Sequence, residues 1–321
     1  MSASPRRGTR LPDALKRRLR LPVIAAPMLR VSGPDLVIAA CRAGVIGAFP
    51  TANARSVDEL DQWLVRIGAA LDRAALPPCC PNLIIRQPRF RDDLACLVRH
   101  RVEMVITSVG SPAAAVGPLH DVGALVFADI ASVRHAEKAI EAGADGLILL
   151  TAGAGGQTGW ANPFAFVRAV RAMFDGPVVL AGGVSDGASL RAAQVLGCDL
   201  AYMGTRFIAT SESLAASRYK EMLVTSTLDD VMTTKAFTGL DANMLRPSIV
   251  AAGLDPARLD EEVSVERAKQ MHGGGSGNDR PRRWTDIWSA GHSVSGVDSI
   301  VDVSALVARL AIEYEAAGKA G

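Results

Sequence analysis

The amino-acid pattern predicts an α/β fold of the (β/α)8 TIM barrel class, and two observations support this prediction. The first is a series of short apolar runs without polar alternation, which is typical of parallel strands buried on both faces. The second is that each run is followed by a stretch with helical spacing. Eight runs occur, at residues 22–25, 45–48, 81–85, 104–107, 125–128, 146–150, 177–181 and 200–203. Eight strand–helix units favour a closed barrel over the alternative, a doubly wound open sheet.

The predicted helices are delimited by polar capping residues and by glycines. A serine or aspartate before the first turn can accept a backbone N–H, and a glycine after the last turn can adopt the left-handed conformation. Three helices are bracketed in this way, by Ser32 and Gly44, by Ser132 and Gly143, and by Ser185 or Asp186 and Gly197. This punctuation supports the alternation of strands and helices.

The strand–helix rhythm stops after Arg206. Residues 212–278 are polar with helical spacing and are predicted to contain no strands. We interpret them as a mainly helical insertion, or lid, near the barrel mouth, and expect them to set substrate specificity. The barrel would then comprise residues 1–211 and 279–321, with a last helix over residues 304–317 that completes the outer ring.

Composition restricts the class of protein. Of 321 residues, 49% are hydrophobic and 21% are charged, which suffices for a large core. The net charge of +2 is too small to indicate a nucleic-acid partner. No apolar run has the length of a membrane span or of a signal-peptide core, so we expect a cytoplasmic protein without a membrane partner. Five cysteines without a CxxC motif argue against a disulfide framework, and no ligand spacing indicates a metal.

The most informative residues follow the last two predicted barrel strands. The active sites of such barrels lie at the C-terminal ends of the strands, and phosphates often bind after strands seven and eight. Gly182 and Gly183 follow the seventh run, and Gly204 and Thr205 follow the eighth. Glycine lets backbone N–H groups approach a phosphate, and a helix N-terminus adds a favourable dipole. These positions predict a phosphorylated cofactor or substrate, with tight-turn glycines as the alternative.

The loop after the sixth run is the second indication of a binding site. It contains Gly153, Gly155, Gly156 and Gly159, so a flat ring could lie against its backbone. The alternative is a merely flexible loop. Its one long polar side chain is Gln157, which can donate and accept hydrogen bonds.

Three other strand ends carry residues of interest. Ala26, Pro27 and Met28 follow the first run, Asn82 is placed near the start of the third, and Asp129 follows the fifth.

Taken in order, these strand-end segments resemble those of the nitronate monooxygenases, once called 2-nitropropane dioxygenases. These FMN enzymes share their barrel with flavin-dependent enoyl reductases. The resemblance covers about residues 20–210 and 288–297 and rests on Ala26-Pro27-Met28, Ala154-Gly155-Gly156, Ala181-Gly182-Gly183-Val184 and Met203-Gly204-Thr205-Arg206-Phe207. It implies non-covalent FMN held by Ala26, Pro27, Met28, Asn82, Ala154, Gly155, Gly156, Gly182, Gly183, Met203, Gly204 and Thr205. The implied phosphate site is Gly183, Gly204 and Thr205, and the implied ring site is Met28, Asn82 and residues 154–156.

The chain departs from this family at the expected catalytic base. The family loop usually reads Ala-Gly-Gly-His, whereas Gln157 stands in the histidine position here. An amide cannot act as a general base near neutral pH. Conversely, His292 stands where the family often has Gly-Gln. Our hypothesis is that His292 supplies the acid–base function, and the alternative is that it is a structural hydrogen bonder. A nitronate is already an anion and needs no base, so a nitronate is expected as substrate rather than a neutral nitroalkane.

The resemblance implies an FMN-dependent oxidoreductase that oxidises alkyl nitronates with O2, with Gln157 orienting the substrate or the flavin. One alternative is an NAD(P)H-dependent reductase of quinones or enoyl thioesters on the same scaffold. A sugar-phosphate isomerase or lyase is disfavoured because Asp129 has no lysine partner at any strand end. A non-catalytic flavin-binding protein also fits the loss of the loop histidine. The physiological substrate and the oligomeric state stay open, with a homodimer among the alternatives.

Overall fold

The computed structural model describes residues 10–273 and 280–319 and contains a closed parallel barrel. Its strands run in the order β1-β2-β3-β4-β5-β6-β8-β9 around the barrel. They are β1 (Val23–Ala25), β2 (Ile46–Pro50), β3 (Cys79–Ile84), β4 (Met104–Ser108), β5 (Leu125–Ile130), β6 (Gly146–Leu150), β8 (Val178–Ala181) and β9 (Leu200–Met203). Each coincides with one of the eight apolar runs. The predicted (β/α)8 barrel is therefore confirmed.

Alternate residues of the strands face the barrel interior and the surrounding helices. Ile24, Ile46, Ile106, Phe127 and Ile148 belong to a buried cluster that fills the interior. The intervening residues pack outward in two larger clusters with the helices. Because both faces of every strand are buried, the strands show as continuous apolar runs in the sequence.

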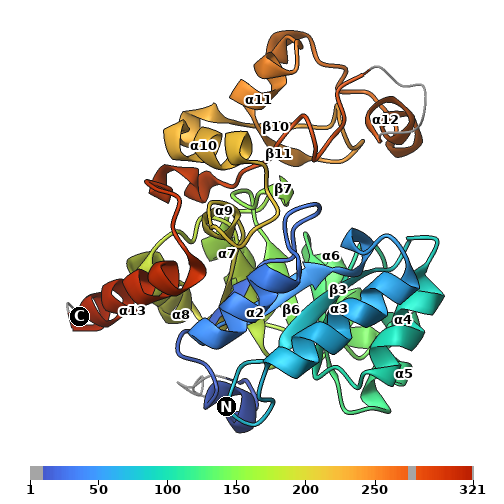
Figure 1. Cartoon of the computed structure of the whole chain (residues 1–321), viewed down its shortest axis with the longest axis vertical. Helices are drawn as coiled ribbons and strands as arrows, with labels where there is room; N and C mark the ends of the chain where they lie inside the picture. Colours follow the sequence, from blue (N-terminus) through green and yellow to red (C-terminus); the bar gives the residue numbers. More distant parts are fainter. Residues whose placement is uncertain (1–9, 274–279, 320–321) are drawn as a thin grey trace.

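The helices alternate with the strands and cover the outside of the barrel (Figure 1). They are α2 (Pro34–Ala43), α3 (Val57–Ala70), α4 (Phe90–Arg99), α5 (Ala113–His120), α6 (Val133–Glu141), α7 (Pro163–Arg171) and α8 (Gly187–Leu196), together with the short α1 (Asp13–Lys16) and α9 (Thr205–Ile208). The last helix, α13 (Val303–Lys319), packs against α2 and α8 and completes the ring as predicted. Among the described helices, none is both long and apolar enough to cross a bilayer.

The capping predictions are confirmed in part. The hydroxyl of Ser132 accepts the N–H of His135 at the start of α6, and Gly44 ends α2 in the left-handed conformation, with φ of 94°. Ser32 is not the N-cap of α2, because Gly33 takes that position. The Ser32 hydroxyl instead accepts the N–H of Met28 and so fixes the segment after β1.

The cap of α8 resolves the choice between two neighbouring residues. Asp186, not Ser185, is the N-cap, and it forms a capping box with Ser189. Gly197 ends this helix in the left-handed conformation.

The insertion contains strands, so the expectation of a strand-free segment is wrong. Besides α10 (Ser217–Thr225), α11 (Arg246–Ala251) and α12 (Val265–His272), it holds the antiparallel pair β10 (Val231–Thr234) and β11 (Ala242–Leu245). The loop strand β7 (Gly156–Gln157) joins β11 as the third strand. Figure 1 shows this part of the chain at one end of the barrel, on the side of β7. The predicted boundary at residues 278 and 279 lies outside the described residues.

Candidate active site

A cleft opens at the C-terminal ends of the barrel strands and encloses about 590 Å3 of open space, its mouth included. Backbone and small side chains dominate its wall, and no charged side chain lines it within the described residues. The lining residues are Ala26, Pro27, Met28, Leu150, Gly153, Ala154, Gly155, Ala181, Gly182, Gly183, Val184, Tyr202, Gly204, Thr205, Ile208, Ser289, Ala290 and Ser293.

The structure places most of the expected cofactor-binding residues on this wall. Those that line the cleft are Ala26, Pro27, Met28, Ala154, Gly155, Gly182, Gly183, Gly204 and Thr205. Asn82, Gly156, Met203, Gln157 and His292 are not part of the lining. Met203 ends β9 with its side chain packed outward into the helix layer, so only its backbone faces this region. Ser289, Ala290 and Ser293, from the segment before α13, complete the wall.

The loops after β8 and β9 present two backbone N–H groups that could donate hydrogen bonds to an anion. Gly183 has a φ of 78°, and a Cβ placed on it would meet nothing within 4 Å, so its backbone faces open space. The N–H groups of Gly183 and Gly204 donate no hydrogen bond within the part of the chain that the structure describes. Loop amides arranged in this way form anion-binding concavities. The geometry fits a phosphate here.

The N-terminus of α8 is less available than the sequence suggested. Its amides already bind two carboxylates, because Asp186 accepts from Ser189 and Glu313 of α13 accepts from Gly187 at 3.0 Å. These negative charges offset the helix dipole at this end. A phosphate would therefore depend on the loop amides and on Thr205. The hydroxyl oxygen of Thr205 accepts the N–H of Gly291 at 2.9 Å, which leaves its proton free to donate.

The glycine loop after β6 is held in place by the insertion. The fully buried Asn243 of β11 donates from Nδ2 to the carbonyl oxygens of Ala152 and Ala154, at 2.8 and 2.7 Å. Gly156 pairs with Asn243, and Gln157 pairs with Ala242. The loop is therefore anchored on one side rather than merely flexible. Asn243 is a supporting residue that sequence reasoning missed, since no motif marks it.

The two residues expected to act in catalysis lie at the edge of the cleft. The side chain of Gln157 is exposed on β7. His292 is also exposed, and its backbone N–H donates to the carbonyl oxygen of Gly153 at 3.0 Å. A Cβ built on Gly153 would stand 3.3 Å from His292 Nδ1 and 3.2 Å from the amide nitrogen of Gly183. The imidazole is therefore close to the loop amides of the candidate phosphate site.

Polar side chains also occupy the mouth of the barrel on β3, β4 and β5. Asn82 is the fourth residue of β3 rather than near its start, and Asp129 lies within β5 rather than after it. Asn82 Nδ2 donates to Ser108 Oγ at 3.1 Å. The Oδ1 atom of Asp129 is buried and has no hydrogen-bond partner among the described residues. Burial raises the pKa of Asp129 to about 7.

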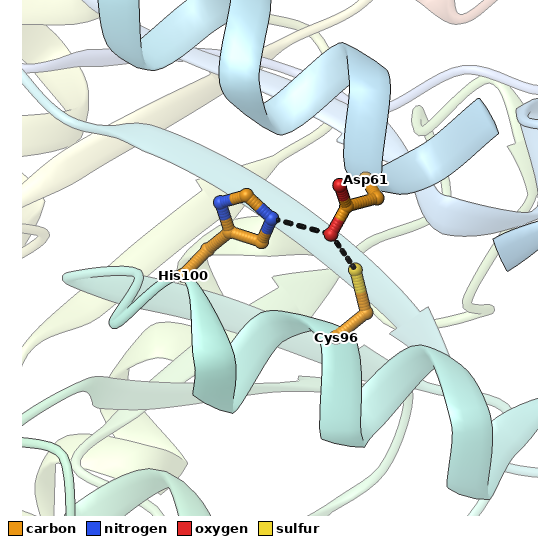
Figure 2. Close-up of side chains that lie close together, drawn as sticks. All are labelled: Asp61, Cys96 and His100. Atoms are coloured by element: carbon orange, nitrogen blue, oxygen red, sulfur yellow. Dashed lines mark hydrogen bonds and ion pairs between the residues drawn. The ribbon is translucent and has the colours of Figure 1, made fainter. Parts of the chain in front are cut away.

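A second group of polar side chains lies away from the cleft, between α3 and α4 (Figure 2). Asp61, Cys96 and His100 have potential ligand atoms within 4.8 Å of one another. Asp61 Oδ1 accepts from His100 at 2.9 Å and from Arg99 at 3.0 Å, and these two donors hold the pKa of Asp61 below its usual range. Since the cationic Arg99 already neutralises this carboxylate, the group is explained as a link between two helices.

The fold and the cleft together define a (β/α)8 barrel whose last two strands end at loop amides that could hold an anionic ligand. A comparison with protein families makes this assignment specific. The family described as nitronate monooxygenase matches residues 82–313, which is more than half of the chain. The chain belongs to this family, as the strand-end segments predicted. The family consists of oxidoreductases that bind a flavin.

Individual relatives agree with this assignment. A (3aS,4S,5R,7aS)-5-hydroxy-7a-methyl-1-oxo-octahydro-1H-indene-4-carboxyl-CoA dehydrogenase of Mycobacterium tuberculosis is 29% identical over 235 residues, which cover 71% of this chain. The alignment spans 64% of that dehydrogenase, which is just under two thirds of its length. A nitronate monooxygenase of Paraburkholderia phytofirmans is 27% identical over 278 residues, covering 73% of this chain and 76% of the relative.

Solved structures show the same fold over almost the whole chain. The structure of FabK from Thermotoga maritima superposes with a TM-score of 0.81 at 26% identity and covers 98% of both chains. A nitroalkane oxidase from Streptomyces ansochromogenes superposes with a TM-score of 0.77 at 24% identity, covering 96% of this chain and 99% of that one. At this identity the second comparison supports the fold alone.

Proposed function

We propose that this chain is an FMN-dependent oxidoreductase that oxidises alkyl nitronates with O2. One observation carries the proposal: in a member of the nitronate monooxygenase family, the unpaired amides of Gly183 and Gly204 open onto the cleft where the family resemblance implies the FMN phosphate. The nitronate monooxygenase of Paraburkholderia phytofirmans supports the choice of reaction.

FMN would be held mainly by backbone groups. The amides of Gly183 and Gly204 and the hydroxyl of Thr205 would bind the phosphate. Met28 and the backbone of residues 154–155 would contact the ring, and Asn82, Ala26, Pro27, Gly156, Gly182 and Met203 complete the proposed cofactor-binding set. When bound, FMN supplies the two-electron redox chemistry, while the protein supplies binding, orientation and electrostatics.

The two edge residues receive different proposed roles. Gln157, exposed on β7 beside the glycine loop, would orient the substrate through its amide. His292 lies beside Gly153, between the proposed ring segment at residues 154–155 and the amide of Gly183. We propose a binding role for His292 there, with its hypothesised acid–base role as the alternative.

We also propose that residues 212–278 form a unit that shapes the substrate end of the cleft, on a barrel built from residues 1–211 and 279–321. The pairing of β11 with β7 supports a role of this unit at the cleft, because it joins the insertion directly to the glycine loop. A cytoplasmic location is proposed with it. The five cysteines, all without a disulfide, are compatible with such a reducing compartment.

The proposed function is tested by an anaerobic absorbance titration of the purified protein. We expect a yellow protein whose flavin absorbance is bleached by propyl-2-nitronate and restored by O2. NADH and NADPH are added in separate titrations, and we expect slow bleaching or none. Bleaching by a reduced nicotinamide but not by the nitronate would replace the proposal with a reductase. A colourless protein that does not take up added FMN would overturn it.

A further inference from the structure

A cysteine, a histidine and a carboxylate meet between α3 and α4, on the outside of the barrel (Figure 2). Cys96 and His100 are four residues apart on α4, where His100 is the C-cap and keeps the helical conformation. Residues four apart lie on the same face of a helix, so both side chains can point to Asp61 of α3. None of the three lines the cleft, so an inference drawn from them is independent of the proposed function.

The three residues supply one sulfur, one nitrogen and one oxygen atom as potential metal ligands. These atoms all lie within 4.8 Å of one another. Asp61 Oδ1 is 2.9 Å from His100 Nε2 and 3.9 Å from Cys96 Sγ. In a tetrahedral zinc site with bonds of about 2.0–2.3 Å, the ligand atoms are about 3.3–3.6 Å apart. Each of the two measured separations therefore differs from that geometry by only a few tenths of an ångström.

The link between the two helices does not depend on Cys96. Asp61 Oδ1 accepts from His100 and from Arg99, and these two hydrogen bonds suffice to join α3 to α4. A thiol is a weak donor, and at 3.9 Å it adds little to them. Cys96 is nevertheless fully buried, and its sulfur points at the carboxylate (Figure 2). The link therefore does not account for the orientation of this sulfur.

An ion can reach this group from solvent. The side chains of Asp61 and His100 are 39% and 20% exposed, whereas Cys96 lies beneath them. The cation that competes for the carboxylate is Arg99. Its side chain is 57% exposed, and within the described residues its guanidinium donates a hydrogen bond to Asp61 alone. An exposed ion pair of this kind contributes little to stability, so Arg99 can turn into water when an ion binds.

We propose that Asp61, Cys96 and His100 bind one Zn2+ ion, with water as the fourth ligand, and that this ion joins α3 to α4. Zn2+ suits the set because it accepts sulfur, nitrogen and oxygen ligands in one tetrahedral site. Mg2+ prefers oxygen ligands and should bind far more weakly. No spacing in the sequence indicates this site, because Asp61 and Cys96 lie 35 residues apart on two helices.

Binding of the ion changes the protons of two ligands. The thiol of Cys96 releases its proton to solvent, and the thiolate sulfur bonds to zinc. His100 coordinates through Nε2, so its imidazole then carries its proton on Nδ1. The carboxylate of Asp61 releases no proton, because its hydrogen bonds from Arg99 and His100 already stabilise the ionised form. The hydrogen bond from Nε2 to Asp61 is replaced by two bonds to the metal.

The chain offers a matched control that lacks the sulfur. His120 Nε2 is 2.9 Å from Asp145 Oδ2, which is the same separation as in the proposed site. These two side chains are also partly exposed, at 41% and 32%. No third potential ligand joins them among the residues that the structure describes. The variant His120→Gln therefore removes a comparable histidine without touching the proposed site.

The affinity is tested by calorimetric titration of the purified full chain with ZnCl2, without a polyhistidine tag and after treatment with a chelator. The wild type should bind one Zn2+ ion with a dissociation constant in the micromolar range or below. Cys96→Ser, at a buried position, and His100→Gln, at a partly exposed one, should each weaken binding at least about 100-fold. His120→Gln should match the wild type. MgCl2 should give no binding heat.

X-ray absorption at the zinc edge identifies the ligands directly. Zinc in the wild type should have one sulfur neighbour at about 2.3 Å and nitrogen or oxygen neighbours at about 2.0–2.1 Å. The sulfur neighbour should be missing in Cys96→Ser. A sulfur neighbour that persists in this variant, or zinc without sulfur in the wild type, would place the ion elsewhere and overturn the proposal. A wild type that binds no zinc, or no more tightly than Cys96→Ser, would overturn it as well.

Discussion

The substitution Asp129→Asn should stabilise the folded protein at alkaline pH, and the size of the effect follows from the burial of one carboxyl group. An unfolded chain ionises this aspartate with a pKa near 3.9. In the folded barrel, burial raises the pKa to about 7. Since one pKa unit corresponds to about 1.4 kcal/mol, a difference of about three units gives an upper bound of about 4 kcal/mol.

The sign of the effect follows from proton binding. Between pH 4 and pH 7 the folded state retains a proton that the unfolded state has released, so raising the pH lowers the free energy of unfolding. This loss is complete above pH 7, where both states are ionised. Asparagine does not titrate and therefore avoids it. The variant and the wild type should be similar in stability near pH 4, and the variant should be more stable by up to about 4 kcal/mol at pH 8.

The assay is urea denaturation followed by tryptophan fluorescence at intervals from pH 4 to pH 8, with Asp121→Asn as the matched surface control. The quantity of interest is the difference in unfolding free energy between variant and wild type, because other titrating groups cancel in this difference. The control should show a difference close to zero throughout. A flat difference for Asp129→Asn, or a variant that becomes less stable as pH rises, would mean that the carboxylate has a stabilising partner and would refute the reasoning.

Three further predictions concern the cleft. Gly183→Ala forces a non-glycine residue into a φ of 78° and adds a methyl group where the phosphate is proposed. The FMN dissociation constant, measured by fluorescence titration, should therefore rise at least about tenfold. Gly68→Ala is the control. Asn243→Ala removes two hydrogen bonds to the glycine loop, so it should destabilise the fold by about 2 kcal/mol and accelerate amide exchange in residues 152–158, whereas unchanged exchange would contradict the anchoring role. His292→Gln should weaken FMN binding in the same titration, because its imidazole lies beside Gly153 near the amide of Gly183, and an unchanged dissociation constant would contradict the binding role.

The barrel was predictable because its signals are local. Parallel strands buried on both faces need continuous apolar runs, and helix ends need glycines or small polar caps, so strand β6 and the end of α8 at Gly197 can be located from their own residues. The strands β10 and β11 could not be found in this way. Each has four residues, and the polar Thr233 and Asn243 interrupt any apolar pattern.

The parts of the site that escaped prediction depend on residues that are distant in sequence. Asn243 binds a carbonyl 91 residues earlier in the chain, and Glu313 reaches an amide 126 residues earlier. No spacing rule can reveal such contacts. Asp129 was visible as a carboxyl near a strand end. Whether it faced the interior and lacked a partner depended on the closure of the barrel and on the pairing of Asn82 with Ser108.

The two sides of the barrel mouth differ in their polar groups: one side presents backbone amides, and the other contains a carboxyl side chain. On the side of β8 and β9, the amides of Gly183 and Gly204 can hold a phosphate without any cationic side chain on the described cleft wall. On the side of β3 to β5, Asp129 is uncompensated, so its ionisation places a negative charge beneath the cleft floor. The amides proposed to hold the phosphate and the buried carboxyl group therefore lie on different strands of the mouth. Lowering the pH below about 7 neutralises the carboxylate of Asp129 and leaves the amides unchanged.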